Sequence, residues 1–271
     1  MNRPAFTSYP ISRHVAGRAP ASGDDALAIE EPLEIRVEGR SVAVTMRTPG
    51  HDEELAAGFL LTEGVITHAG DVLEISQCAA TTDQTGNIVD VLLRRPGAVD
   101  FAQLTRHVFS ASSCGLCGKA TLKAIEQRFP ALDASATPNR AMLLGLPEQL
   151  QTQQPAFSQT GGLHAAALFD DVGHLLVVRE DVGRHNAVDK VLGHILLRRD
   201  RSGPSAATGL LVSGRISFEI VQKALAARLS VIAGVSAPTS LAVDLARRSG
   251  QTLVGFLRPG RLNVYTGHVA S

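Results

Sequence analysis

The sequence predicts an α/β fold in which a mixed sheet packs against helices, preceded by a smaller β-rich lobe. Beyond Gly162, short apolar runs typical of buried strands alternate with longer helical patterns, joined by short connections. Over residues 33–46, apolar residues recur at every second position instead. The sheet should be mixed because Phe169 to Leu175 reads as a hairpin inside the C-terminal pattern.

The composition of the chain argues against several functional classes, namely nucleic-acid binding, membrane binding and export. The chain has 271 residues, 44% of them hydrophobic, which is enough for two lobes packed on each other. Lys+Arg and Asp+Glu both number 26, so no net charge draws the protein to nucleic acid or to an acidic membrane. The start lacks the apolar centre of a signal peptide, and two of the three cysteines share one short motif. We expect a cytoplasmic protein that binds neither nucleic acid nor membrane.

Three regions are expected along the chain. Residues 1–26 lack periodicity and are rich in Pro, Ser, Ala and Gly, which predicts a disordered leader. Residues 27–130 form the N-terminal lobe, ending in a Cys-x-x-Cys loop and the helix after it. Residues 131–271 form the C-terminal α/β core, and the irregular stretch at its start, 131–162, joins the lobes.

The elements of each lobe follow from apolar spacing and from turn and cap residues. In the N-terminal lobe we expect a hairpin over 33–46, a helix from 52 to 60 that ends at Gly64, strands at 72–75 and 88–93, and helices at 101–108 and from 119. In the C-terminal core we expect strands at 165–169, 175–179, 210–212, 231–235, 253–257 and 262–265, and helices at 186–197, 217–228 and 239–248.

The segment Cys114-Gly-Leu-Cys117 is the first candidate catalytic site. Flanking glycines give the backbone freedom, a helix is expected to start beside it, and Lys119 adds positive charge. These features favour the thiolate form of a cysteine. Such a thiolate can accept sulfur from a persulfide or take part in disulfide exchange.

Two other interpretations of this cysteine pair remain open. A structural zinc site needs four ligands, and only Cys78 and scattered histidines are left to supply them. A thioredoxin-type redox motif needs a preceding strand that the sequence does not show. Cys78, at the end of a strand-like run, is interpreted as a small buried apolar residue. No metal site is predicted.

Two later loops have the form strand, small residues, helix, and so can offer backbone N–H groups to an anion. The first contains Ser213-Gly214-Arg215, where the arginine adds a fork of donors suited to phosphate; the second spans 232–239. Either loop has a plainer interpretation, because Ser213 and Thr239 can simply cap the helices that follow.

A third candidate lies between the last two strands, in Phe256-Leu257-Arg258-Pro259-Gly260-Arg261. A ring and two guanidinium groups there can hold a purine and its phosphates. A solvated turn is the alternative.

The run from Arg179 to Lys190 concentrates titratable groups where a strand gives way to a helix. A metal site is conceivable, but ion pairs at a helix start give the same pattern, and His185 can be structural or functional. His164 invites comparison with zinc deaminases, yet Ala166 occupies the place of their catalytic Glu, which argues against deamination.

These segments together resemble the FdhD/NarQ family of formate dehydrogenase accessory proteins. The motifs that carry the resemblance are Thr48-Pro49-Gly50-His51, Gly58-Phe59-Leu60-Leu61-Thr62-Glu63-Gly64, the cysteine segment, Thr160-Gly161-Gly162-Leu163-His164, Glu180-Asp181-Val182-Gly183-Arg184-His185-Asn186-Ala187, Ser213-Gly214-Arg215 and Gly255-Phe256-Leu257-Arg258. They cover nearly everything after the leader.

The resemblance implies a cytidine-deaminase-like core without deaminase activity, and a homodimer. It implies a sulfurtransferase that takes sulfur from a cysteine desulfurase and delivers it to the bis-molybdopterin guanine dinucleotide form of the molybdenum cofactor, for formate dehydrogenase. Cys114 matches the persulfide-bearing cysteine, Cys117 its partner, and Phe256 to Arg261 the segment that contacts the dinucleotide. GDP or GMP would then mimic the cofactor. A non-catalytic chaperone that only carries the cofactor is the alternative.

Overall fold

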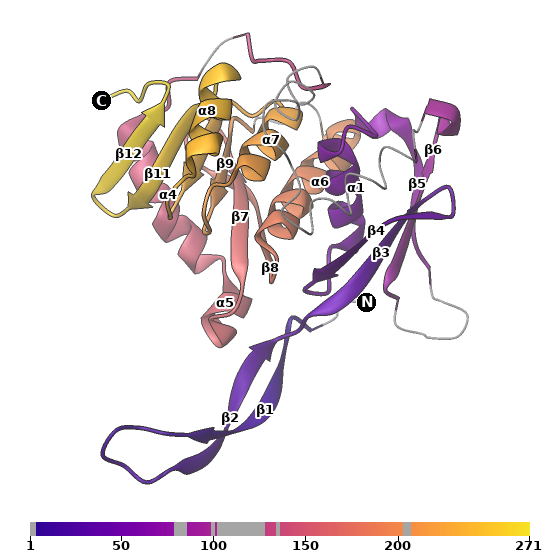
Figure 1. The fold of residues 1–271 in the computed structure, drawn as a ribbon. Helices are drawn as coiled ribbons and strands as arrows, with labels where there is room; N and C mark the ends of the chain where they lie inside the picture. The colour runs from indigo at the N-terminus through magenta and orange to yellow at the C-terminus, as the bar shows by residue number, and fades with distance from the viewer. Residues whose placement is uncertain (1–3, 79–85, 99–100, 102–127, 134–135, 203–206) are drawn as a thin grey trace.

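The protein contains three β-sheets and several helices in a computed structural model that describes residues 4–78, 86–98, 101, 128–133, 136–202 and 207–271 (Figure 1). None of the described helices is long and apolar enough to cross a membrane. The expected helix starting at 119 and the cysteine segment fall outside the described residues, as does all of the expected helix at 101–108 except Phe101.

The larger sheet has six strands in the order β12-β11-β10-β9-β7-β8. Their bounds are β7 His164–Phe169, β8 Leu175–Asp181, β9 Gly209–Val212, β10 Val231–Gly234, β11 Thr252–Arg258 and β12 Arg261–Thr266. The three strands β9, β10 and β11 are parallel, whereas β7 pairs antiparallel with β8 and β9, and β12 with β11. The prediction of a mixed sheet containing a β7–β8 hairpin is confirmed.

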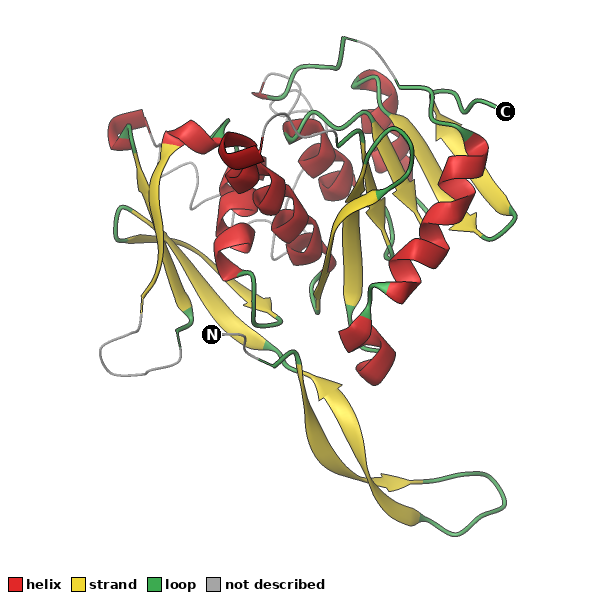
Figure 2. Ribbon diagram, turned by 180° about the vertical axis from the view of Figure 1, so that it is seen from behind, coloured by secondary structure: helices red, strands yellow, loops and turns green. Residues whose placement is uncertain are grey.

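Helices cover both faces of this sheet. Helices α6 (Arg184–Ser202), α7 (Phe218–Ala226) and α8 (Ser240–Arg248) lie on one face, and α4 (Arg140–Thr152) lies on the other, which Figure 2 shows from behind. Strand β9 buries side chains on both faces: Leu210 and Val212 belong to the core under α6, α7 and α8, whereas Leu211 belongs to the core under α4. Alternate side chains of a strand point to opposite faces, so a strand covered on both sides is apolar throughout.

The smaller sheet has four strands in the order β4-β3-β6-β5. They are β3 Glu31–Val37, β4 Arg40–Arg47, β5 Val72–Cys78 and β6 Ile88–Leu93, with α1 at Asp52–Thr62 and two single-turn 3-10 helices at Ala69–Asp71 and Pro96–Ala98. The expected hairpin over 33–46 is confirmed. Its turn holds Glu38 at φ 52° and Gly39 at φ 74°, the left-handed pair of a tight hairpin turn.

One continuous hydrophobic core joins the two sheets. Helix α1 packs on α6, and buried residues of β3, β6, α1, α6, β9 and α7 belong to the same cluster. Polar contacts cross this junction as well: the Arg179 guanidinium donates to the Glu54 carboxylate at 2.6 and 2.8 Å, linking β8 to α1. The two sheets therefore share their buried surface.

The expectation of a disordered leader is wrong for most of its length. Strands β1 (Phe6–Arg13) and β2 (Ala21–Ala28) pair antiparallel over their whole length. This ribbon extends away from the body of the molecule (Figures 1 and 2). Most of its side chains on both faces are exposed. Because neither face is buried, the ribbon lacks the alternation of apolar and polar residues by which strands are recognised in a sequence.

The stretch 131–162 is also more regular than expected, because it contains α4 and α5 (Pro155–Thr160). Pro147 lies inside α4, and proline ordinarily breaks a helix. Two features offset it: the Asn139 side chain caps the first turn by accepting from Ala141 N at 2.8 Å, and the helix buries a leucine stripe. The members of that stripe are Leu143, Leu146 and Leu150.

Candidate functional site

Cys114 and Cys117 lie outside the described residues, but residues on either side of them are held firmly. On the upstream side, the Arg40 guanidinium lies 4.5 Å from the centre of the Phe101 ring. On the downstream side, Arg228 Nη1 donates to the carbonyl of Pro130 at 2.6 Å. Arg228 lies three residues before Val231, the first residue of β10, so Pro130 lies near the amino end of that strand.

The candidate cofactor loops gather at the opposite edge, where the parallel strands end. Ser213-Gly214-Arg215 follows β9, and the next residue, Ile216, forms a backbone bridge with Pro238 in the loop after β10. That second loop in turn accepts a hydrogen bond at Ser236 O from the backbone of Phe256, at 3.1 Å. The structure thus brings together the three segments that the sequence singled out separately.

The two capping interpretations have different outcomes. Thr239 does cap α8, since its hydroxyl accepts from Ala242 N at 3.3 Å. Ser213 does not cap α7, whose N-cap is Ser217. The Ser213 hydroxyl instead accepts from Ala165 N at 2.9 Å and so fixes the loop to β7. Arg215 is exposed beside it.

The β11–β12 turn combines a distorted strand with exposed cations. Phe256 has φ 50°, in the left-handed region that residues with a Cβ rarely adopt, and it lies within the register shift between Gly255 and Arg258. Arg258 and Arg261 face each other across the turn, and both are exposed. Among the described residues neither guanidinium has an ion-pair partner. This arrangement suits an anion, and it also fits a solvated turn.

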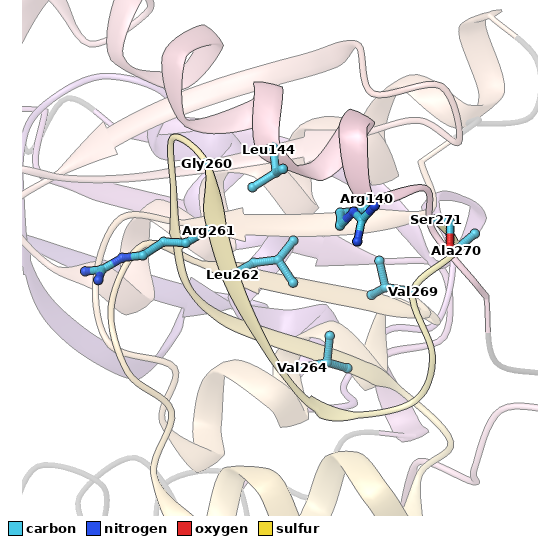
Figure 3. A pocket seen from close by; sticks show the side chains of 9 residues that line it. All are labelled: Arg140, Leu144, Gly260, Arg261, Leu262, Val264, Val269, Ala270 and Ser271. Carbon is cyan, nitrogen blue, oxygen red and sulfur yellow. The ribbon is translucent and has the colours of Figure 1, made fainter.

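A pocket of about 450 Å³ lies on the α4 side of the same turn (Figure 3). Its apolar wall is formed by Leu144, Leu262, Val264 and Val269, with Arg140 among them. Arg261 also lines it, but Figure 3 shows its guanidinium directed away from the apolar side chains. The sequence singled out Gly260 and Arg261 of the lining but did not indicate the apolar wall, whose residues come from α4, β12 and Val269.

A second group of polar side chains lies next to Gly214. It comprises His164 at the start of β7, Arg184 and His185 at the start of α6, and Ser217 and Glu219 at the start of α7. A Cβ atom on Gly214 would come within 3.3 Å of His164 Nδ1 and 3.7 Å of the Arg184 Cβ. His185 Nε2 lies 3.4 Å from Ser217 Oγ and 3.9 Å from the Glu219 carboxylate.

Both histidines of this group are neutral near pH 7. Burial, and then the charge of Arg184, lowers the pKa of His164. Burial, followed by the charges of Lys223 and Arg184, lowers the pKa of His185 to about 4. The sequence indicated His164 and His185 only as members of separate motifs. Their proximity to one loop was not foreseeable from positions 21 residues apart.

The run from Arg179 to Lys190 largely holds the fold together, as the ion-pair interpretation predicts. Asp181 is fully buried, and its carboxylate accepts from Gly183 N at 2.8 Å and pairs with Lys190 Nζ at 2.7 Å. Lys190 Nζ also donates to Thr48 O at 2.8 Å, which ties α6 to the N-terminal lobe. Within the described part of the chain, no three His, Cys, Asp or Glu side chains come together as metal ligands.

The profile of the FdhD/NarQ family matches residues 28–270. The chain belongs to the FdhD/NarQ family. The match begins at the last residue of β2, so the projecting ribbon precedes the part that the family profile describes.

Individual FdhD/NarQ relatives extend the similarity to nearly the whole chain. The sulfur carrier protein FdhD of Mycobacterium bovis is 52% identical over 271 residues, covering 96% of each chain. That of Streptomyces coelicolor is 51% identical, covering 90% of this chain and 88% of its own. A solved structure from Desulfotalea psychrophila, described as a formate dehydrogenase accessory protein, superposes with a TM-score of 0.77 at 29% identity, covering 97% of this chain and 98% of its own.

Proposed function

We propose that this FdhD/NarQ protein is a sulfurtransferase that carries sulfur on Cys114 to the molybdenum cofactor of formate dehydrogenase. One observation carries the proposal: Cys114-Gly-Leu-Cys117 occurs in a chain half identical to proteins named sulfur carriers. The thiolate of Cys114 attacks the outer sulfur of a cysteine desulfurase persulfide. The S–S bond breaks, the desulfurase cysteine leaves as a thiolate, and a persulfide forms on Cys114.

The substrate of the second step is the bis-molybdopterin guanine dinucleotide cofactor. Ser213-Gly214-Arg215 and the β11–β12 turn support this proposal, because they lie on one edge of the sheet and offer exposed cations and strand-end backbone groups. The ring of Phe256 and the guanidinium groups of Arg258 and Arg261 would hold the guanine nucleotide. GDP and GMP are the soluble mimics for testing this.

The candidate cofactor loops lie at the carboxyl ends of the parallel strands. Cys117 is proposed to relay or protect the sulfur on its way to the cofactor.

Mass spectrometry tests the first step directly. After incubation with a cysteine desulfurase and cysteine, the wild-type protein should gain one sulfur atom that a reductant removes. Cys114→Ala should abolish the gain, while Cys78→Ala, a matched change outside the motif, should leave it intact. A wild-type protein of unchanged mass would rule out the carrier function.

Two alternatives make different predictions. If the protein is a non-catalytic chaperone, its Cys114→Ala variant should still support active formate dehydrogenase. If it is a sulfurtransferase, the same variant should bind the cofactor but no longer support that activity. A structural zinc held by the cysteine pair would appear at one equivalent in metal analysis of the purified protein. Stoichiometric zinc would exclude the persulfide proposal.

The family also supports three further proposals about the whole molecule. We propose that it works in the cytoplasm, that it forms a homodimer, and that its six-stranded sheet is of the cytidine-deaminase type. Light scattering at several concentrations measures the oligomeric state.

A further inference from the structure

The outer side of β12 is an open edge of the six-stranded sheet. β12 is the last strand in the sheet order, so no strand of the described chain pairs with its outer side. After Arg261 the strand has no charged residue and no proline, the residues by which natural proteins prevent pairing at an edge. The unpaired backbone N–H and C=O groups of such a strand form a template for one more strand.

The pocket of Figure 3 lies beside this edge, on the α4 face of the sheet. Leu262 and Val264, two positions apart on β12, point to the same face and line it together with Leu144 of α4. Leu144 and Leu262 pack against the core under α4, whereas Val264 is 43% exposed. The core therefore reaches the surface at this edge, where apolar side chains from outside can extend it.

Arg140 gives one end of the pocket a positive charge. Its backbone N–H donates to Ala270 O at 2.9 Å, which places it at the end away from the β11–β12 turn (Figure 3). Arg140 is exposed, its guanidinium has no ion-pair partner among the described residues, and none of these adds an Asp or Glu side chain to the lining. Ser271 also lines the pocket, but its backbone oxygen already accepts from Asn139 Nδ2 at 3.1 Å. A carboxylate is the side chain that complements this end.

We propose that this edge binds an extended segment of a partner protein, which adds a strand antiparallel to β12, inserts aliphatic side chains into the pocket and pairs a carboxylate with Arg140. Antiparallel pairing is the more stable arrangement per residue. Alternate residues of the segment point into the pocket, so a strand as long as β12 places three side chains there. A second copy of this chain fits less well, because it brings Arg140, Arg258 and Arg261 against the same three cations. The inference is independent of the sulfur-carrier proposal.

Fluorescence anisotropy on the full chain tests the recognition with a labelled hexapeptide, Thr-Asp-Thr-Val-Thr-Val. In an antiparallel strand the aspartate lies at the Thr266 end of β12, on the Arg140 side. The wild type should bind it about 10- to 100-fold more tightly than a version with lysine in place of aspartate, the worth of a charge-assisted hydrogen bond. Arg140→Gln should abolish that difference. Arg247→Gln, at an exposed arginine of α8, is the matched control and should keep it.

Pairing along the backbone has its own measurement. Amide hydrogen exchange over residues 261–266 should slow when the peptide binds, because the added strand occupies N–H groups on the outer side of β12. Val264→Lys, which puts a charge on the edge, should weaken binding of both peptides. Val172→Lys, at a more exposed valine in the β7–β8 turn, is the control and should leave their binding unchanged.

The proposal fails if the wild type binds neither peptide or binds both equally, and this comparison needs no variant. Binding without slower exchange over residues 261–266 would also overturn it, because the peptide would then lie elsewhere. A dimer of the protein alone that dissociates on Val264→Lys would show that a second copy occupies the edge, and would overturn the proposal as well. Circular dichroism checks that each variant is folded. Persulfide loading of Cys114 should be unchanged in all of them, which separates this test from the proposed function.

Discussion

Gly193 of α6 packs directly against the backbone of Gly58 in α1. A Cβ atom at position 193 would lie 2.8 Å from Gly58 N and would overlap the carbonyl oxygen of Glu54. A Cβ atom at position 58 would overlap the carbonyl oxygen of Asp189. The atoms that an added Cβ would meet belong to the backbone, so they cannot move away as the end of a flexible side chain can. The two helices that join the sheets cross so closely only because both positions lack a side chain.

Gly193→Ala should therefore destabilise the protein by at least about 1–3 kcal/mol, the range of overpacked sites, despite the higher helix propensity of alanine. Urea unfolding measures the change. Gly145→Ala in α4 is the control, because a Cβ there meets no atom within 4 Å. That control should leave the free energy of unfolding unchanged or raise it by roughly 0.5–1 kcal/mol. Equal effects of the two substitutions would show that the helices can separate without cost.

Lys190→Met should cost about 3–5 kcal/mol, because it leaves the buried Asp181 carboxylate without its ammonium partner. Both side chains of the pair are essentially unexposed. Adding Asp181→Asn to Lys190→Met should recover part of the loss, and a double-mutant cycle quantifies the coupling. The exposed pair of Arg247 and Asp244 provides the comparison: Arg247→Met should change stability by less than about 1 kcal/mol. A similar small effect at Lys190 would contradict the buried pairing.

Stability should fall as the pH drops from 6.5 toward 4, because His185 stays neutral in the folded state while it takes up a proton when unfolded. A histidine with a lowered folded-state pKa favours folding above its unfolded pKa and loses that contribution on acidification. His51 and His164 shift in the same direction. His185→Gln should flatten the pH dependence of stability without abolishing it, because His51 and His164 keep their lowered pKa values. An unchanged slope in thermal melts across this window would mean that His185 is not neutral in the fold.

GDP should protect the protein against thermal unfolding by mass action. Arg258→Ala and Arg261→Ala should each reduce that protection, because their exposed guanidinium groups supply the charge at the β11–β12 turn. Arg13→Ala on the projecting ribbon is a matched exposed arginine far from the turn and should keep the full shift. Undiminished protection in both turn variants would rule out this segment as the nucleotide site.

The sequence sufficed for elements whose residues pack on a core. Leu33, Ile35 and Val37 alternate because one face of β3 is buried, and every expected strand from β7 onward lies where its apolar run is. The sequence did not predict the elements whose formation depends on something other than a buried apolar face of regular period. The β1–β2 ribbon has no buried face to impose alternation, and α4 forms around Pro147 because its leucine stripe and Asn139 cap outweigh the proline.

The candidate site was foreseeable only in pieces. Loops after β9 and β10 follow from strand and helix signals, and their common edge follows from parallel pairing. The meeting of His164 with His185, or of Arg184 with Glu219, depends on which helix starts beside which strand, and no local pattern encodes that. The cysteine motif was the clearest chemical signal in the sequence, and it lies outside the described residues.

The shared core beneath α1 and α6 has a thermodynamic consequence for the whole chain. Neither sheet can expose its inner face to water without uncovering the other, so both should melt in one cooperative step with coincident signals from every probe. A fragment of residues 131–271 would carry the buried face of α6 bare and should associate or stay unfolded. The N-terminal lobe and the six-stranded sheet are thus one folding unit, and a mutation that destabilises either will destabilise both.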